Sequence, residues 1–253
     1  MTSGLDYAFA GGAGLLAGGV NAIAGGGTLI SFPALQAIGL SSIDANITNI
    51  VALTPGYLAG SYAQRQDLVG QARTARRLGV AAGLGGLVGS VVLVTVTGKT
   101  FSDVVPYLIL LACAALVAQN RIRALLEARR AAHTRPLGDG HLERAAVFCI
   151  GAYGGFFGAG LSIMFLAVLG LFTDDPLNRV NALKQVLSLV VSVLASAFLV
   201  FTGHVVWGVA AVVAACCIVG GFLGGRVAHR VNPTVLRLLV VLLGVAVAIH
   251  YWA

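Results

Sequence analysis

The feature that most constrains the fold is a pair of long charge-free stretches, each interrupted by glycines. The first covers residues 7–43, with three glycines at 25–27 and Pro33 close behind them. The second covers residues 145–173, with a Gly-Ala-Gly sequence at 158–160. Non-helical backbone is tolerated within a bilayer only where it is buried in protein or lines a cavity. Breaks of this kind in both halves of a chain are typical of a transporter binding site at a repeat interface.

Composition places the whole chain in a membrane. Of its 253 residues, 58% are hydrophobic and only 10% are charged, and the mean hydropathy of +0.93 excludes an ordinary soluble domain. A helical bilayer crossing takes roughly 20 apolar residues. The sequence therefore predicts an all-α, multi-pass membrane protein. Its other charge-free runs cover residues 45–64, 78–98, 104–120, 185–225 and 238–253.

The net charge of +7 indicates orientation in the bilayer rather than nucleic acid as a partner. The basic residues, 14 arginines and 2 lysines, lie mainly in short segments between apolar runs, as the positive-inside rule expects. The excess of Arg over Lys, with abundant Ala, Gly and Val, suggests a bacterial source and hence the bacterial inner membrane. Residues 1–6 lack the basic region of a cleaved signal peptide, so the first apolar stretch is expected to be retained.

Matching motifs at a separation of about 135 residues predict an internal duplication. The two homologous repeats are residues 1–120 and 145–253, and the basic segment 121–144 is expected to be a cytoplasmic linker between them. Each repeat is predicted to hold one broken element followed by three plain transmembrane helices. Besides the glycine motifs, the matching pairs are 46–49 with 181–184 and 85–89 with 220–224.

The length of the broken elements bears on whether they cross the membrane. As one helix, residues 7–43 would extend about 55 Å, too long for one crossing of about 30 Å, whereas two crossings with a turn need more than about 40 residues. The intermediate length favours two half-helices that meet at the glycines as a re-entrant hairpin. The basic loops 65–77 and 226–233 would then both face the cytoplasm, and the repeats would be inverted; a single crossing would place the second loop outside.

Polar side chains cluster around the glycine breaks and at the starts of the helices that follow, where a bilayer tolerates them only at a cost. At helical spacing, Asn181, Lys184 and Gln185 share one face, and Asn46 and Asn49 share another. The candidate substrate-binding residues are Gly25, Gly26, Gly27, Thr28, Asn46, Asn49, Gly158, Gly160, Ser162, Asn181, Lys184 and Gln185. The same clusters also contain Asn21, Ser31, Gln36, Thr48, Thr54, Ser188 and Ser192.

The chemistry of this set favours a small anion. Helix starts beside glycines expose unpaired N–H groups and a partial positive charge, which together bind oxyanions. Lys184 adds a cation within the predicted spans, and few carboxylates lie there. The site is compatible with a homo-oligomer and with coupling to a proton or another ion, and it implies no metal or cofactor.

Several of these residues also have plainer structural interpretations. Asn46 and Asn181 would serve equally as helix N-caps, and Lys184 would reach the cytoplasmic surface from the first turn of its helix. His204 and Asp67 follow matching helices and are interpreted as solvated turns rather than proton-coupling groups. The glycines expected to allow close helix packing are Gly85, Gly89, Gly220, Gly221 and Gly224.

The glycine-rich run 17–35 and the segment 44–60 resemble the signature of the TauE/SafE sulfite exporter family of bacterial membrane permeases. Residues 180–189 resemble the matching second-half segment, and the similarity covers nearly the whole chain except the linker. The family implies a transporter of sulfite, organosulfonates or related small anions in the inner membrane, often by efflux. The reduced second glycine motif departs from the pattern and predicts two unequal half-sites.

The sequence thus predicts a secondary transporter, a permease or exporter, of a small sulfur-containing anion such as sulfite or an organosulfonate. The substrate would lie near mid-membrane between the broken elements. A permease or channel for another small anion or metabolite is the alternative. A membrane-embedded enzyme is less favoured, because the sequence has no HExxH motif, P-loop or clustered His and Cys ligands.

Overall fold

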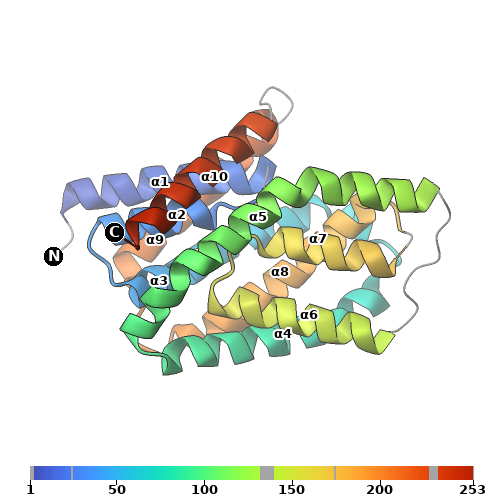
Figure 1. The fold of residues 1–253 in the computed structure, drawn as a ribbon, viewed down its shortest axis with the longest axis horizontal. Helices are drawn as coiled ribbons and strands as arrows, with labels where there is room; N and C mark the ends of the chain where they lie inside the picture. The colour runs from blue at the N-terminus through green and yellow to red at the C-terminus, as the bar shows by residue number, and fades with distance from the viewer. Residues whose placement is uncertain (1–2, 24, 132–139, 174, 228–232, 253) are drawn as a thin grey trace.

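The protein is built from helices, as its composition predicted (Figure 1). The computed structural model describes residues 3–23, 25–131, 140–173, 175–227 and 233–252. Most of the loop 226–233, including Arg230, lies outside the described residues. The helices are α1 (Gly4–Ile23), α2 (Thr28–Ala37), α3 (Ser42–Ala63), the short 3₁₀ helix η1 (Arg65–Leu68), α4 (Ala72–Thr95), α5 (Gly98–Ala131), α6 (Gly140–Phe156), α7 (Leu161–Phe172), α8 (Leu177–Leu199), α9 (Trp207–Val227) and α10 (Pro233–His250).

Both glycine motifs interrupt a helix, as predicted. Between α1 and α2, Gly25 has a φ of 74° and Gly26 a φ of 103°. Between α6 and α7, Gly158 has a φ of 78° and Gly160 a φ of 74°. A side chain with a Cβ adopts this left-handed region only with strain, so glycine allows the chain to leave one helix and begin the next within a few residues.

The two limbs at each break are unequal in length. α1 has 20 residues and α2 has 10, and α6 has 17 residues and α7 has 12. At the helical rise, α1 extends about 30 Å and α2 about 15 Å. Each break therefore joins a longer helix before it to a shorter helix after it, rather than two half-helices of equal length.

Each half of the chain packs mainly against the other half. α1 lies along α9 in the same direction, since Gly14 of α1 faces Val213 of α9 and Gly18 faces Cys217 four residues further on. α4 and α6 pair in the same way. α3 contacts α8, and α5 contacts α10. The pairing is reciprocal between the halves. The helix before the first break, α1, packs on α9, and the helix before the second break, α6, packs on α4.

Small residues allow the paired helices to approach closely. A Cβ added at Gly220 of α9 would lie 1.9 Å from the carbonyl oxygen of Leu15 on α1, so no side chain fits there. Gly221 is different, because a Cβ there would meet nothing closer than the carbonyl oxygen of Gly18 at 3.8 Å. The predicted packing role is therefore wrong for Gly221 and confirmed for Gly85, Gly89, Gly220 and Gly224.

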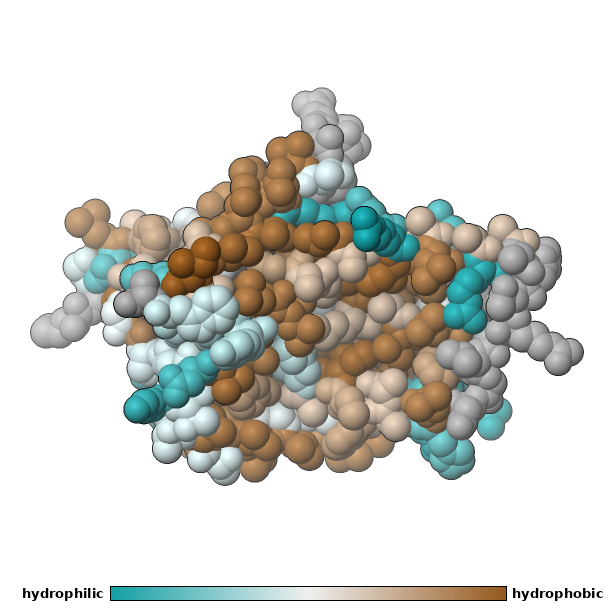
Figure 2. All heavy atoms as spheres, in the orientation of Figure 1, coloured by the Kyte–Doolittle hydropathy of each residue, from teal (hydrophilic) through white to brown (hydrophobic). Residues whose placement is uncertain are grey.

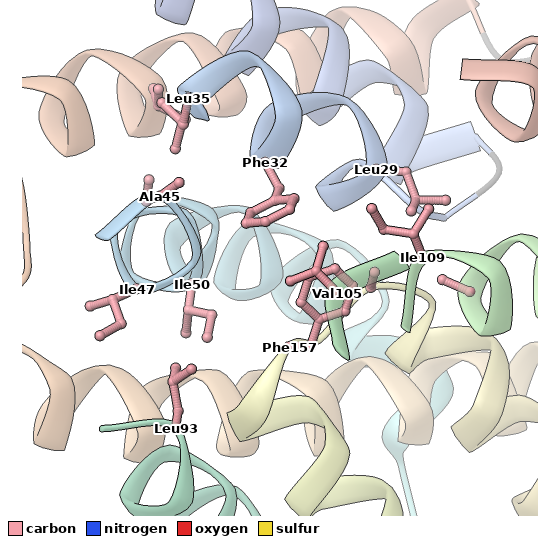
Figure 3. Close-up of a cluster of buried hydrophobic side chains, with 14 of the residues drawn as sticks. Leu29, Phe32, Leu35, Ala45, Ile47, Ile50, Leu93, Val105, Ile109 and Phe157 are labelled. Atoms are coloured by element: carbon pink, nitrogen blue, oxygen red, sulfur yellow. The ribbon is translucent and has the colours of Figure 1, made fainter. Parts of the chain in front are cut away.

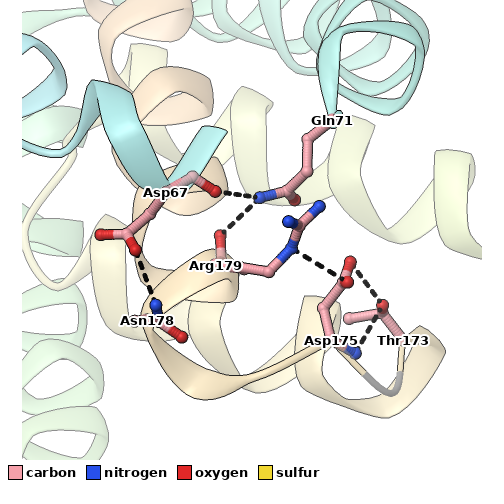
Figure 4. Close-up of polar contacts among 6 residues, drawn as sticks. All are labelled: Asp67, Gln71, Thr173, Asp175, Asn178 and Arg179. Carbon is pink, nitrogen blue, oxygen red and sulfur yellow. Dashed lines mark hydrogen bonds and ion pairs between the residues drawn. The ribbon is translucent and has the colours of Figure 1, made fainter. Parts of the chain in front are cut away.

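One end of the helix assembly, which we call the basic end, is held by contacts between η1, the start of α4 and the start of α8 (Figure 4). Asn178 Nδ2 donates to Asp67 Oδ1 at 2.6 Å, and Gln71 Nε2 donates to the carbonyl oxygen of Arg179 at 3.2 Å. The arginines whose side chains the structure describes lie on helix turns at this basic end. They are Arg65, Arg73, Arg76, Arg77, Arg121, Arg123, Arg129, Arg144, Arg179 and Arg237.

The opposite end, which we call the Asp44 end, is held by the start of α3 and the segment between α8 and α9. His204 Nδ1 lies 2.7 Å from Asp44 Oδ1, and the backbone N–H of Val206 donates to Thr48 Oγ1 at 3.1 Å. His204 and Asp67 both follow a helix, as expected. Each is more than a solvated turn, however, because each contacts the start of the other member of the α3–α8 pair.

The apolar residues divide between a packed interior and an outer surface. Phe32 of α2 packs edge-on against Phe157, and around them lie side chains from α2, α3 and α5 (Figure 3). The face seen in Figure 2 is largely hydrophobic across its middle, with hydrophilic residues toward its left and right margins and in a patch near its upper edge. Within the described residues, α4, α5, α8 and α9 are long and apolar enough to cross a membrane. The protein is accordingly a multi-pass membrane protein.

Adjacent glycines on α9 offer a matched test of the close helix packing. We expect Gly220→Ala to destabilise the protein by about 1–3 kcal/mol, because its methyl group would overlap the α1 backbone. Gly221→Ala should leave stability unchanged or raise it slightly, because alanine is the better helix former. Thermal unfolding of both variants in detergent measures the difference. Equal Tm values would contradict the close packing of α1 on α9.

Candidate functional site

A cavity of about 720 Å³ lies between the two glycine breaks and the basic end. Side chains from both halves of the chain line it, on α1, α3, α5, α7, α8 and α9. Its volume lies within the range of sites for whole small molecules. The polar lining residues are Asn21, Tyr57, Gln64, Asp67, Gln119, Arg123, Ser162, Asn178, Asn181, Lys184 and Gln185.

The two breaks lie close together against the middle of α5. A Cβ added at Gly26 would lie 2.9 Å from Cδ1 of Leu116, and one at Gly160 would lie 3.4 Å from Cα of Ala112, one turn away on the same helix. The breaks also approach each other directly, because a Cβ at Gly25 would lie 3.8 Å from Cγ1 of Ile163. The fold thus brings together two motifs about 135 residues apart in the sequence.

Asn21 holds the first break from within α1. Its Oδ1 accepts hydrogen bonds from the backbone N–H groups of Gly26 at 3.3 Å and Gly27 at 3.4 Å. Two of the amides that the sequence suggested for an anion are therefore already occupied by a side chain. Of the three glycines in this motif, only Gly25 lines the cavity.

The second half of the chain supplies most of the predicted site residues found at the cavity. Asn181, Lys184 and Gln185 line it from one face of α8, as their helical spacing predicted, and Ser162 lines it from the start of α7. Gln185 also packs over α3, where a Cβ added at Gly60 would lie 2.2 Å from its Nε2. The cavity is thus shaped by the approach of α8 to α3.

The predicted residues of the first half of the chain, apart from Gly25, lie outside the cavity, and its two predicted asparagines bond within the protein. Asn46 is fully buried, and its Nδ2 donates to the carbonyl oxygen of Phe156 at 2.8 Å, where α6 ends. Asn49 is also buried, and its Oδ1 accepts from Ser31 Oγ at 2.5 Å. The predicted residues that do not line the cavity are Gly26, Gly27, Thr28, Asn46, Asn49, Gly158 and Gly160.

The N-cap interpretation of the two asparagines is wrong. The N-cap of α3 is Ser41, whose Oγ accepts from the backbone N–H of Asp44 at 3.1 Å. The N-cap of α8 is Pro176. Asn46 and Asn181 therefore lie inside their helices, one turn beyond the capping positions.

Two residues of α5, Gln119 and Arg123, line the cavity although the sequence did not single them out. Arg123 was assigned to the linker, whereas α5 continues as a helix to residue 131. The signal that would have found them is their spacing of four residues at the end of an apolar run, which places both on one helix face.

The charges around the cavity favour an anion. Lys184 and Arg123 line it as cations, and Arg237 lies near enough to act on the charge of Lys184. The single carboxylate among the lining residues is that of Asp67, which accepts a hydrogen bond from Asn178. None of the lining residues belongs to the contacts that hold the Asp44 end.

Comparison with known proteins agrees with this geometry. The model of the family described as "Sulfite exporter TauE/SafE" matches residues 10–251, nearly the whole chain. The chain belongs to this family. As a member of the TauE/SafE family, it is a membrane transporter, which confirms the resemblance seen in the sequence.

Two relatives carry names of the same kind. The chain is 26% identical to the "Probable membrane transporter protein YfcA" of Escherichia coli (strain K12) over 218 residues, which cover 85% of this chain and 77% of that protein. It is 27% identical to a "Probable membrane transporter protein" of Haemophilus influenzae over 241 residues, or 91% of this chain and 88% of that protein. No solved structure matches the chain.

Removing the side chain of Asn21 tests how the first break is held. We expect Asn21→Ala to destabilise the protein by about 1–3 kcal/mol, because two backbone N–H groups lose their acceptor. Asn21→Asp restores an acceptor and should recover much of that stability, yet it places a negative charge at the cavity and should weaken anion binding. Tm and anion affinity measured on both variants separate the two effects. Equal stability of Asn21→Ala and the wild type would contradict a holding role.

Proposed function

We propose that this member of the TauE/SafE family is a secondary transporter of a small sulfur-containing anion, such as sulfite or an organosulfonate. The observation that carries the proposal is the cavity between the two helix breaks, which is lined by Lys184, Arg123 and neutral hydrogen-bond donors. Cationic and amide groups in a partly enclosed site bind oxyanions strongly.

The substrate would lie between α8 and the breaks. Lys184 would supply charge, Asn181 and Gln185 would donate from their side-chain amides, and Ser162 would donate from its hydroxyl at the start of α7. The start of α7 adds the partial positive charge of a helix N-terminus. The buried partners of the first repeat, such as Asn49, would complete the site only after a rearrangement.

The family name suggests sulfite, and the cavity volume also accommodates larger substrates. A site of about 720 Å³ holds an organosulfonate or another small organic anion as readily as an inorganic ion. A permease for such an anion is therefore the second candidate. A continuous channel is less favoured, because none of the residues that line the cavity belongs to the contacts at the Asp44 end. An enzyme is less favoured, because the lining residues include no paired catalytic acid and base.

Transport would proceed by alternating access between two inverted repeats. The packing supports this arrangement: α1 and α9 run parallel, so α1 begins at the Asp44 end, and α2 returns there, where Gln36 hydrogen-bonds to Tyr251. α6 begins instead at the basic end, where Glu143 pairs with Arg77, and α7 returns toward that end. Each broken element would thus be a re-entrant hairpin, and the two would enter from opposite sides.

Charge suggests how the transporter sits in the bacterial inner membrane. The basic end carries the described arginines, whereas Lys99 lies at the start of α5 toward the Asp44 end. By the positive-inside rule the basic end, with the linker 121–144, would face the cytoplasm. The cavity would then be accessible from the cytoplasm. Asp44 and His204 form a carboxylate–imidazole contact at the Asp44 end, which makes them the natural candidates for coupling to a proton.

The two lysines of the chain provide a matched test of the function. We expect Lys184→Gln to weaken binding and saturable transport of sulfite or an organosulfonate by about tenfold or more, because a charge-assisted hydrogen bond is lost. Lys184→Arg should retain most of the activity. Lys99→Gln removes an exposed lysine far from the cavity and should change nothing. Flux into proteoliposomes and binding to purified protein provide the measurements; unchanged flux in Lys184→Gln would count against this site.

Single cysteines at the starts of α1 and α6 test the inverted arrangement. In a background with the four native cysteines replaced by serine, Leu5→Cys and Leu142→Cys introduce thiols at two exposed positions. We expect a membrane-impermeant thiol reagent to label Leu5→Cys from the periplasmic side and Leu142→Cys only after the cytoplasmic side is exposed. Labelling of both from the same side would show that the repeats are not inverted.

A further inference from the structure

Gln119 and Arg123 of α5 lie one helical turn apart and line the same cavity as Lys184 of α8. Neither belongs to the polar clusters that surround the glycine breaks in the sequence. Both lie on α5, the helix against which both breaks pack, whereas Lys184 lies on α8. They would therefore contact a bound molecule from a different helix than Lys184.

Each of these two side chains has a buried polar atom without a hydrogen-bond partner among the described residues. For Gln119 the atom is Oε1, and the whole residue is only 2% exposed. For Arg123 the atom is Nε. Buried polar groups are nearly always paired in native proteins, because an unpaired group costs about 1–3 kcal/mol. The Nε–H of Arg123 is thus a donor without an acceptor among the described residues, and Gln119 adds an amide group to the same wall of the cavity.

The charged residues around the cavity indicate which kind of molecule it would bind. Arg123 and Lys184 face one cavity as two cations, and Arg237, bonded to Asn120, acts on the charge of Lys184 from nearby. The carboxylate of Asp67 is engaged by the amide of Asn178. A singly charged anion would neutralise one of the two cavity cations, whereas a doubly charged anion would interact favourably with both and relieve their mutual repulsion.

We propose that Arg123, with Gln119 beside it, forms with Lys184 a two-cation site that selects divalent oxyanions over monovalent oxyanions of the same size. The planar guanidinium group suits this role, since it donates two parallel hydrogen bonds to a pair of oxyanion oxygens. The amide of Gln119 then hydrogen-bonds the same bound anion through its NH₂ group. The inference rests on the proposed function and adds the charge of the substrate to it.

Thiosulfate and methanesulfonate are suitable probes, because they share a sulfonate-like group and differ mainly in a charged sulfur or a neutral methyl group at the fourth position. Binding of each anion to the purified full-length protein is measured by isothermal titration calorimetry at constant ionic strength. We expect the wild-type protein to bind thiosulfate at least about tenfold more tightly than methanesulfonate, since the second charge interacts with the second cation.

Substitutions at Arg123 separate charge from structure. Arg123→Gln should abolish most of the preference, lowering thiosulfate affinity by about tenfold while changing methanesulfonate affinity much less. Arg123→Lys retains the cation and should keep the preference for the divalent anion. Arg121→Gln removes an exposed arginine from the same helix and should behave as wild type. A Tm within a few degrees of wild type for each variant shows that the fold is intact.

The outcomes distinguish this inference from the proposed function. If the wild type binds both anions with equal affinity, or if Arg123→Gln weakens both by the same factor, the two-cation site is refuted while anion transport stands. If the wild type binds neither anion and transports neither, both the inference and the proposed function fail. If Arg121→Gln reduces the preference as much as Arg123→Gln does, the selectivity comes from the general positive field of the basic end, and the assignment to Arg123 is overturned.

Discussion

Backbone groups freed at the two helix breaks are the constraint on which the rest of the structure depends. In an apolar medium an unpaired peptide group costs several kcal/mol, so a broken helix persists only where other groups bind its ends. Asn21 accepts from the amides that follow the first break, and Asn46 donates to the carbonyl oxygen of Phe156, where α6 ends before the second break. The hydroxyl group of Tyr153 also donates to the carbonyl oxygen of Ala159, at 2.6 Å.

The helices that follow the two breaks, α3 and α8, place their polar side chains differently. Asn46 of α3 is buried and bound to α6, whereas its counterpart Asn181 of α8 lines open space. Likewise Asn49 is bonded to Ser31, whereas Lys184 at the matching position faces the cavity. A lysine cannot pack neutrally where an asparagine does, because its charge needs water, a counterion or a ligand. The two halves of the chain thus differ along the helices that follow the breaks as well as in their glycine motifs.

The parts of the fold that the sequence predicted are those that depend on local properties. Glycine at positions 25 and 158 permits the left-handed backbone that other residues rarely adopt, and charge-free length indicates membrane helices. The face shared by Asn181, Lys184 and Gln185 follows from helical spacing alone. In contrast, the partner of Asn46 lies 110 residues away on α6, and no local pattern identifies a bond to a backbone oxygen there.

The same distinction explains why Arg123 was assigned to a linker. The end of the apolar run at residue 120 marks where composition changes, but the following residues, rich in Arg, Ala and Leu, are strong helix formers that let α5 continue to residue 131. A membrane boundary and a helix boundary are separate properties, and only the first is visible as a change in charge. Gln119 and Arg123, which line the cavity, lie just before and just after the end of the apolar run, and both belong to α5.

A few polar contacts join α3 and α8 at each end of the protein. Asp44–His204 and Thr48–Val206 join these helices at one end, and Asp67–Asn178 joins them at the other. Hydrogen bonds of this kind contribute about 0.5–1.5 kcal/mol each, and exposed ion pairs contribute less than about 1 kcal/mol. States that differ by two or three such contacts therefore differ by only a few kcal/mol, which the binding free energy of one small anion is large enough to shift.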